Sequence, residues 1–217
     1  MSFSKSFKSQ LYNISEYNFE ESAISLFQHQ ARYNYVYKNY IDHLNIQVSK
    51  INKLQQIPFL PISFFKTNKV VTNNWKEEKI FQSSGTTGLN TSQHYVKSLS
   101  DYLNNAEIIF NKKYGSITDY HILALLPSYL ERDNSSLVFM ADHFIKRSNS
   151  DFSGFYLNNL NDLSNVLQRA YASNRKVLLM GVTFALLDLV EYNQFKMSEL
   201  IVMETGGMKG RRKEMIR

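Results

Sequence analysis

The chain has 217 residues and a mass of 25.4 kDa, with 43% hydrophobic residues, 20% charged residues, a net charge of +6 and no cysteine. This composition excludes an intrinsically disordered chain and predicts a globular fold with an ample core. Without cysteine there is no disulfide, thiolate-bound zinc or cysteine nucleophile, so thioester chemistry would need the sulfur of another molecule.

Sequence patterns also bear on location and partners. No apolar run reaches the roughly 18 residues of a membrane span, and the first residues lack the apolar core of a secretory signal. We therefore expect a cytoplasmic protein. The positive charge suits an anionic partner such as a nucleotide. The basic residues are scattered except at positions 209–213, and no nucleic-acid-binding motif is present, so we expect no nucleic-acid partner.

The first part of the chain is expected to be helical. Residues 1–17 are polar and rich in serine, which predicts a loosely attached arm. Between residues 18 and 43 the apolar positions recur at spacings of three and four, which predicts an amphipathic helix or helical hairpin that packs on the main domain. We therefore expect an N-terminal arm and helical extension over residues 1–56.

The rest of the chain alternates between short β runs and helical stretches. Ser98 and Asp101 have the spacing of a capping box at the start of one such helix. Short strands separated by longer helices predict an α/β domain over residues 57–217, with a mostly parallel sheet flanked by helices. Strands are expected at 69–72, 79–81, 121–126, 176–180 and 200–203, and helices at 100–113, 135–146, 160–173, 184–192 and from about 210.

A loop rich in hydroxyls and glycine follows the strand expected at 79–81. It reads Ser-Ser-Gly-Thr-Thr-Gly over residues 83–88. Short donors and flexible glycines can converge on a polyanion, so the loop is a candidate phosphate site. It is not a Walker A loop, because no Lys-Ser or Lys-Thr pair follows at the required spacing. The alternative is a solvent-exposed polar turn.

Three further blocks also come directly after expected strands: residues 127–132, 181–183 and 205–207. In a parallel sheet, ligands bind at the carboxyl ends of the strands. We therefore expect the four blocks to meet at one edge of the sheet and to form one site.

These blocks, in this order, resemble the adenylate-forming superfamily. The resemblance is carried by residues 83–88, 126–136, 181–187 and 204–211, and it covers most of the chain from about residue 57 onward. Within the superfamily, the chain is most similar to acyl-protein synthetases of the LuxE type and to the phenylacetate-CoA ligase branch. The resemblance implies ATP-dependent activation of a fatty or aryl carboxylic acid as acyl-AMP, with Mg²⁺, release of pyrophosphate, and transfer to a thiol of CoA or of a partner protein.

The resemblance also implies a role for each block. The loop would hold the phosphates, the glycine pair would support the adenine or ribose, and the remaining residues would line the acyl pocket, where Gly181 would let substrate approach the backbone. The residues so assigned are Ser83, Ser84, Gly85, Thr86, Thr87 and Gly88 for phosphate; Thr205, Gly206 and Gly207 for the base and ribose; and Ser128, Tyr129, Arg132, Gly181, Val182 and Thr183 for the acyl group.

Each assignment has a structural alternative. Thr183 could instead cap a helix, and residues 205–208 could form a plain turn. The basic run at 209–213 could attract phosphate or be a solvated face. The loop also lacks the Pro-Lys that many relatives carry after the second glycine, for which His94 and Lys97 are possible substitutes or ordinary surface residues.

The later blocks of the superfamily are missing from the sequence. Among them are a Tyr-x-x-Thr-Glu motif whose Glu holds magnesium, an aspartate for the ribose, and a catalytic lysine in a small C-terminal domain. We therefore expect a truncated polypeptide with its catalytic and metal-binding residues beyond Arg217. The alternative function is that of a catalytically silent nucleotide-binding or complex-forming fragment.

Overall fold

The computed structural model describes residues 3–83, 91–126, 134–156, 159–206, 208 and 212. The chain divides into two compact units, Met1–Ile80 with Asn90–Lys97, and Phe81–Leu89 with Ser98–Arg217. Residues 57–80, which the sequence analysis assigns to the second domain, thus lie in the first unit. The reason is their apolar side chains, since Ile57 and Leu60 pack against the core of the helical region.

The first unit is mainly helical, and its core consists of Phe27, Ala31, Tyr37 and Ile41. The expected loose arm at its start is instead a helix, α1, whose Phe3 ring stacks on the His29 ring with centroids 4.0 Å apart. The helices of this unit are α1 (Phe3–Gln10), η1 (Leu11–Asn13), α2 (Phe19–Tyr33), α3 (Tyr35–His43), η2 (Val48–Lys50), η3 (Leu54–Gln56) and α4 (Phe64–Thr67).

Asn34 separates α2 from α3. Its backbone is extended, with φ −102° and ψ 107°, so the predicted amphipathic stretch is a helical hairpin rather than one helix. The Asn34 Oδ1 atom accepts a hydrogen bond from the backbone N–H of Tyr37 at 3.2 Å and thereby caps α3. Asn34 also forms an antiparallel bridge with Thr72, which is all that the strand expected at 69–72 contributes.

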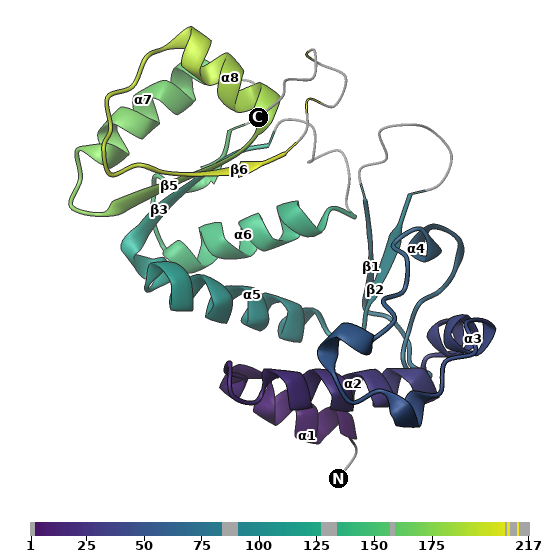
Figure 1. Cartoon of the computed structure of the whole chain (residues 1–217). Helices are drawn as coiled ribbons and strands as arrows, with labels where there is room; N and C mark the ends of the chain where they lie inside the picture. Colours follow the sequence, from purple (N-terminus) through teal and green to yellow (C-terminus); the bar gives the residue numbers. More distant parts are fainter. Residues whose placement is uncertain are drawn as a thin grey trace. The chain divides into compact units, whose positions relative to one another are not determined.

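The second unit contains a four-stranded sheet in the order β4-β3-β5-β6, and each neighbouring pair is parallel. This confirms the predicted α/β class. In Figure 1, α5 and α6 lie on one side of the sheet, and α7 and α8 lie on the other. The strands are β3 (Tyr120–Leu125), β4 (Gly154–Phe155), β5 (Lys176–Val182) and β6 (Ile201–Thr205), while β1 (Lys79–Gln82) and β2 (Gln93–Val96) form a separate two-stranded sheet.

The helices of the second unit begin close to the predicted positions. The Ser98 hydroxyl accepts a hydrogen bond from the Asp101 N–H at 3.2 Å, so the predicted cap is present. The central strands are buried on both faces, as expected for a parallel sheet between helices: Ile122, Leu123, Leu178 and Met180 have no exposed surface. The helices are α5 (Leu99–Tyr114), η4 (Ile117–Asp119), α6 (Ser136–Ser148), α7 (Leu160–Tyr171) and α8 (Thr183–Tyr192).

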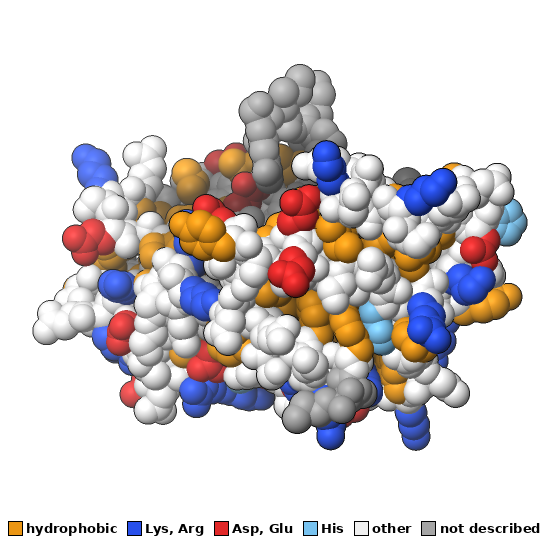
Figure 2. Space-filling view, turned by 60° about the horizontal axis from the view of Figure 1, so that its bottom comes forward, with side chains coloured by type: hydrophobic (Ala, Val, Ile, Leu, Met, Phe, Trp, Pro, Cys, Tyr) orange, Lys and Arg blue, Asp and Glu red, His pale blue; other side chains and the backbone are white. Residues whose placement is uncertain are grey.

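Surface features of the described residues bear on partners. None of their helices is long and apolar enough to cross a membrane. On the face seen in Figure 2, basic and acidic side chains are interspersed with apolar ones rather than gathered by sign. The net charge of +6 is therefore not concentrated as one positive patch on that face.

Candidate functional site

The central strands of the sheet end side by side. In the register of the sheet, Leu125 of β3 is opposite Gly181 of β5, and Gly181 is opposite Glu204 of β6. One step further, Val182 is opposite Thr205. The blocks at 181–183 and 205–207 thus begin side by side at the carboxyl ends of β5 and β6, whereas the block at 127–132 lies outside the described residues.

The strand that precedes the hydroxyl-rich loop is anchored to the same region. The backbone N–H of Gln82 donates a hydrogen bond to the carbonyl oxygen of Asn134 at 2.9 Å. The neighbouring Phe81 is buried, and its ring packs against Tyr102 and Phe139 at centroid distances of 5.2 and 5.6 Å. Asn134 lies two residues before α6, so this hydrogen bond joins the end of β1 to the residues that lead into α6.

A side-chain hydrogen bond joins the ends of β5 and β6. Thr183 is the first residue of α8, and its Oγ1 donates to Glu204 Oε1 at 2.5 Å. The capping interpretation of Thr183 is therefore wrong: Val182 occupies the cap position, and no side chain makes a cap hydrogen bond there. The Thr205 hydroxyl donates to the Gly181 carbonyl at 3.4 Å, a longer contact that links the same two strands.

Gly181 is needed for packing. A Cβ atom at this position would lie 2.7 Å from Cγ and Cδ2 of Leu186 in α8. The Leu186 side chain thus fills the space where a larger residue would project, and α8 packs tightly on the end of β5. The glycine is accounted for by this helix packing, whereas the sequence analysis assigns it to close approach of substrate.

Arg212 is engaged by acidic side chains. Its guanidinium donates to Asp188, with Nε 3.0 Å from Oδ1, and to both carboxylate oxygens of Glu191 on α8. These hydrogen bonds, first that to Glu191 and then that to Asp188, raise the pKa of Arg212 above its usual value. Within the basic run at 209–213, Arg212 is therefore directed to α8 rather than to a phosphate.

A buried histidine lies at the opposite edge of the sheet. The ring nitrogens of His121, near the start of β3, contact the hydroxyls of Ser150 at 2.5 Å and Ser173 at 2.7 Å. Burial, and secondarily the charge of Arg175, lower the pKa of His121. A histidine with both nitrogens engaged, 5% exposed and at the amino edge, is a structural residue of the sheet.

The structure thus brings together Gly181, Val182, Thr183, Thr205 and Gly206, while Ser83 follows the anchored β1 strand. Glu204 was not among the predicted site residues. The only feature of the sequence that points to Glu204 is its position directly before Thr205, in the block at 204–211 that resembles the superfamily. The remaining predicted residues lie outside the described ones: Ser84, Gly85, Thr86, Thr87, Gly88, Ser128, Tyr129, Arg132 and Gly207.

No protein-family model, curated protein or solved structure matches this chain. Within the part of the chain that the structure describes, no group of three or more His, Asp or Glu side chains is arranged to hold a metal ion. Function is therefore inferred from the motifs and from the geometry of the sheet edge.

Proposed function

We propose that this protein activates a carboxylic acid, fatty or aryl, as acyl-AMP at the expense of ATP. The acyl group then passes to a thiol of CoA or of a partner protein, because the chain itself has no cysteine. An ATP-consuming reaction of this kind suits the cytoplasm. The intermixed charges in Figure 2 support an anionic small molecule over nucleic acid as the partner.

The observation that carries the proposal is the common edge of the sheet. The register of β3, β5 and β6 supports it, because Leu125, Gly181 and Glu204 are level with one another and two of the motif blocks begin at the ends of β5 and β6. A site of this kind would let one group of residues hold the phosphates while another holds the acyl group. Holding two anions in line is the main requirement for adenylation.

The proposed adenylation step needs little general acid or base catalysis. An ionised carboxylate attacks the α-phosphorus, the bond to the bridging oxygen breaks, and pyrophosphate leaves. No proton has to be removed, so a histidine base is not required. Bound Mg²⁺ would neutralise charge on the phosphates, and it commonly uses one or two carboxylates together with phosphate oxygens. The exposed Glu204 carboxylate, oriented by Thr183, would add one ligand to those that the resemblance implies beyond Arg217.

The test is acid-dependent exchange of labelled pyrophosphate into ATP by the purified chain, with a panel of fatty and aryl acids. Exchange that needs both Mg²⁺ and a carboxylic acid is the expected result. Calorimetry with a non-hydrolysable ATP analogue accompanies it. Nucleotide binding without exchange would favour the silent nucleotide-binding alternative, and the absence of both would contradict the proposal.

A further inference from the structure

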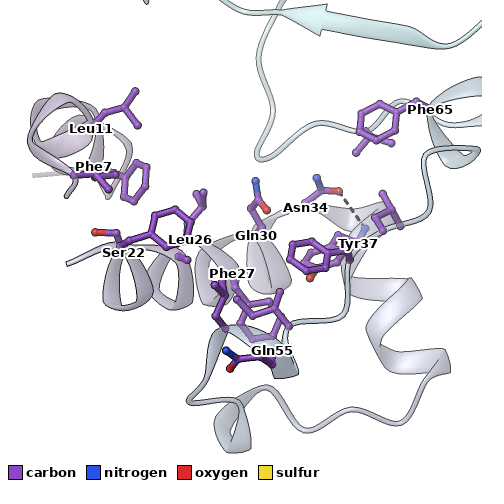
Figure 3. A pocket seen from close by; sticks show the side chains of 18 residues that line it. Phe7, Leu11, Ser22, Leu26, Phe27, Gln30, Asn34, Tyr37, Gln55 and Phe65 are labelled. Atoms are coloured by element: carbon purple, nitrogen blue, oxygen red, sulfur yellow. Dashed lines mark hydrogen bonds between the residues drawn. The ribbon is translucent and has the colours of Figure 1, made fainter. Parts of the chain in front are cut away.

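A pocket lies within the first unit, in its helical part. It has a volume of about 680 Å³ and is formed by α1, η1, α2, η3 and the segment from residue 57 to 70. This volume falls within the range of about 300–1,000 Å³ that is typical of small-molecule sites. Figure 3 shows its lining side chains, with Phe7 and Leu11 on one side, Phe65 on another, and Leu26 and Phe27 on α2.

Most of the side chains that line this pocket are apolar. The exceptions are Ser22, Gln30, Asn34, Tyr37 and Gln55, so none of the lining side chains carries a charge. A buried carboxylate or ammonium without a partner is costly. The pocket therefore suits an uncharged ligand with a large apolar body.

Two amide side chains provide a polar point in the lining. Gln30 is on α2, Asn34 directly follows the last residue of that helix, and both side chains line the pocket (Figure 3). Asn34 is only 5% exposed, and its Oδ1 is already used to cap α3. Among the described residues, the Asn34 Nδ2 and the Gln30 amide group make no hydrogen bond. These N–H groups are therefore left to donate to a ligand.

The Tyr37 hydroxyl does not compete for that role. The Tyr37 hydroxyl already donates to the Pro58 carbonyl oxygen at 2.6 Å. A ligand that meets both the amide donors and the apolar walls must carry a neutral acceptor, such as a carbonyl oxygen, on an apolar body. The Asn34 Nδ2, which belongs to a residue that is 5% exposed and has no hydrogen-bond partner among the described residues, is the kind of donor that a specific ligand satisfies.

We propose that this pocket binds an uncharged amphiphilic molecule, an alkyl or aryl compound with a carbonyl group, whose oxygen accepts hydrogen bonds from Gln30 and Asn34. The pocket is formed by residues of the first unit, whereas the adenylation proposal depends on sheet residues of the second unit. The two proposals can therefore fail separately.

The test uses an uncharged fluorescent naphthalene ketone as the probe, displaced by a series of straight-chain 2-alkanones in the absence of nucleotide. Saturable binding is expected. Each added methylene should tighten binding about four-fold until the pocket is filled, because each buried methylene contributes about 0.8 kcal/mol. An alkane of equal length should bind about two- to ten-fold more weakly than the ketone, since it makes no hydrogen bond.

The variants separate the polar and apolar contributions. Gln30→Leu should remove most of the preference for ketone over alkane while keeping the chain-length dependence. Gln28→Leu, on the same helix but not lining the pocket, should change neither. Ala23→Phe should fill the pocket and abolish binding, with circular dichroism used to check that the helices remain.

Several outcomes would overturn the proposal. These are the absence of saturable binding by the wild-type chain, an unchanged ketone preference in Gln30→Leu, and tighter binding of an alkyl carboxylate than of the ketone of equal length. The last result would mean that the head group is recognised as an anion.

Discussion

The Thr183 hydroxyl and the Glu204 carboxylate are joined across the carboxyl ends of β5 and β6, with Oγ1 and Oε1 2.5 Å apart. This hydrogen bond fixes the first residue of α8 to the neighbouring strand. It also restricts the rotamers of Glu204, which is otherwise an exposed side chain at the proposed site. The pair links the fold of the second unit to its proposed chemistry.

The Thr183→Val variant tests this link. The substitution keeps the side-chain shape and removes the hydroxyl, so the free energy of unfolding should fall by only about 1 kcal/mol at this partly exposed site. Affinity for an ATP analogue with Mg²⁺ should fall several-fold, because Glu204 loses its fixed orientation. Thr118→Val, whose hydroxyl contacts Ser116 away from this edge, is the control. Equal nucleotide affinity in both variants would count against a role for Thr183.

A second prediction concerns the packing of α8 on β5. Gly181→Ala should lower the free energy of unfolding by about 1–3 kcal/mol, because its Cβ would clash with Leu186. Gly154→Ala, where the nearest atom is Tyr156 Cε2 at 3.9 Å, should have a much smaller effect. Urea unfolding measures both. In a Leu186→Ala background the cost of Gly181→Ala should shrink, since the clashing atoms are gone.

His121 should make the stability of the second unit depend on pH. Its pKa in the folded protein lies below the ordinary 6.5, so the unfolded state binds more protons between the two values. Its contribution is therefore complete above pH 6.5 and declines as the pH falls below it. Urea unfolding at pH 7.5 and at lower pH should show a smaller pH dependence for His121→Gln than for the wild type.

The pH dependence of stability also has to be measured for a variant of His29. Burial lowers the pKa of His29 too, and its Nε2 makes no hydrogen bond. It belongs to the first unit, where it stacks on Phe3. The same sign applies, so acidification should loosen the contact between α1 and α2. Comparison of His29→Gln with His121→Gln assigns each part of the pH dependence. If neither variant differs from the wild type, burial of these rings does not govern acid stability.

Glu107 should contribute in the same pH direction as His121, but in a lower pH range. It bridges α5 and α6 by accepting hydrogen bonds from Arg147 and contacting His143 Nε2 at 2.9 Å. Hydrogen bonding to Arg147, and then to His143, lowers the pKa of Glu107 below the ordinary 4.5. Its stabilising effect is therefore present above pH 4.5 and is lost as the pH falls further. The wild type and Glu107→Gln should differ in unfolding midpoint at pH 7 and converge in strong acid.

Much of the second unit could be predicted from the sequence. The apolar runs of β3 and β5 are buried on both faces, and such runs indicate a parallel sheet without knowledge of its partners. The cap of α5 could be predicted because the Ser98 hydroxyl bonds the N–H of Asp101, only three residues away. Features of this kind can be predicted because all the residues that form them lie within a short stretch of sequence.

The failures involve contacts that are distant in the sequence. Helix α1 is polar and looked like a loose arm, yet its Phe3 stacks on His29 of α2. Strand β4 has only two residues, and it exists because it pairs with β3 some 30 residues earlier. The hydrogen bond of Thr183 to Glu204 depends on the strand register, which no local pattern specifies.

The extended backbone at Asn34 has a mechanical consequence. Since the helical hydrogen-bond pattern is interrupted there, α2 and α3 are two separate helices rather than one continuous helix. The antiparallel bridge between Asn34 and Thr72, and the hydrogen bond from the Tyr37 N–H to Asn34 Oδ1, hold the residue at which the two helices meet. Any change in the angle between the two helices would therefore be centred on Asn34.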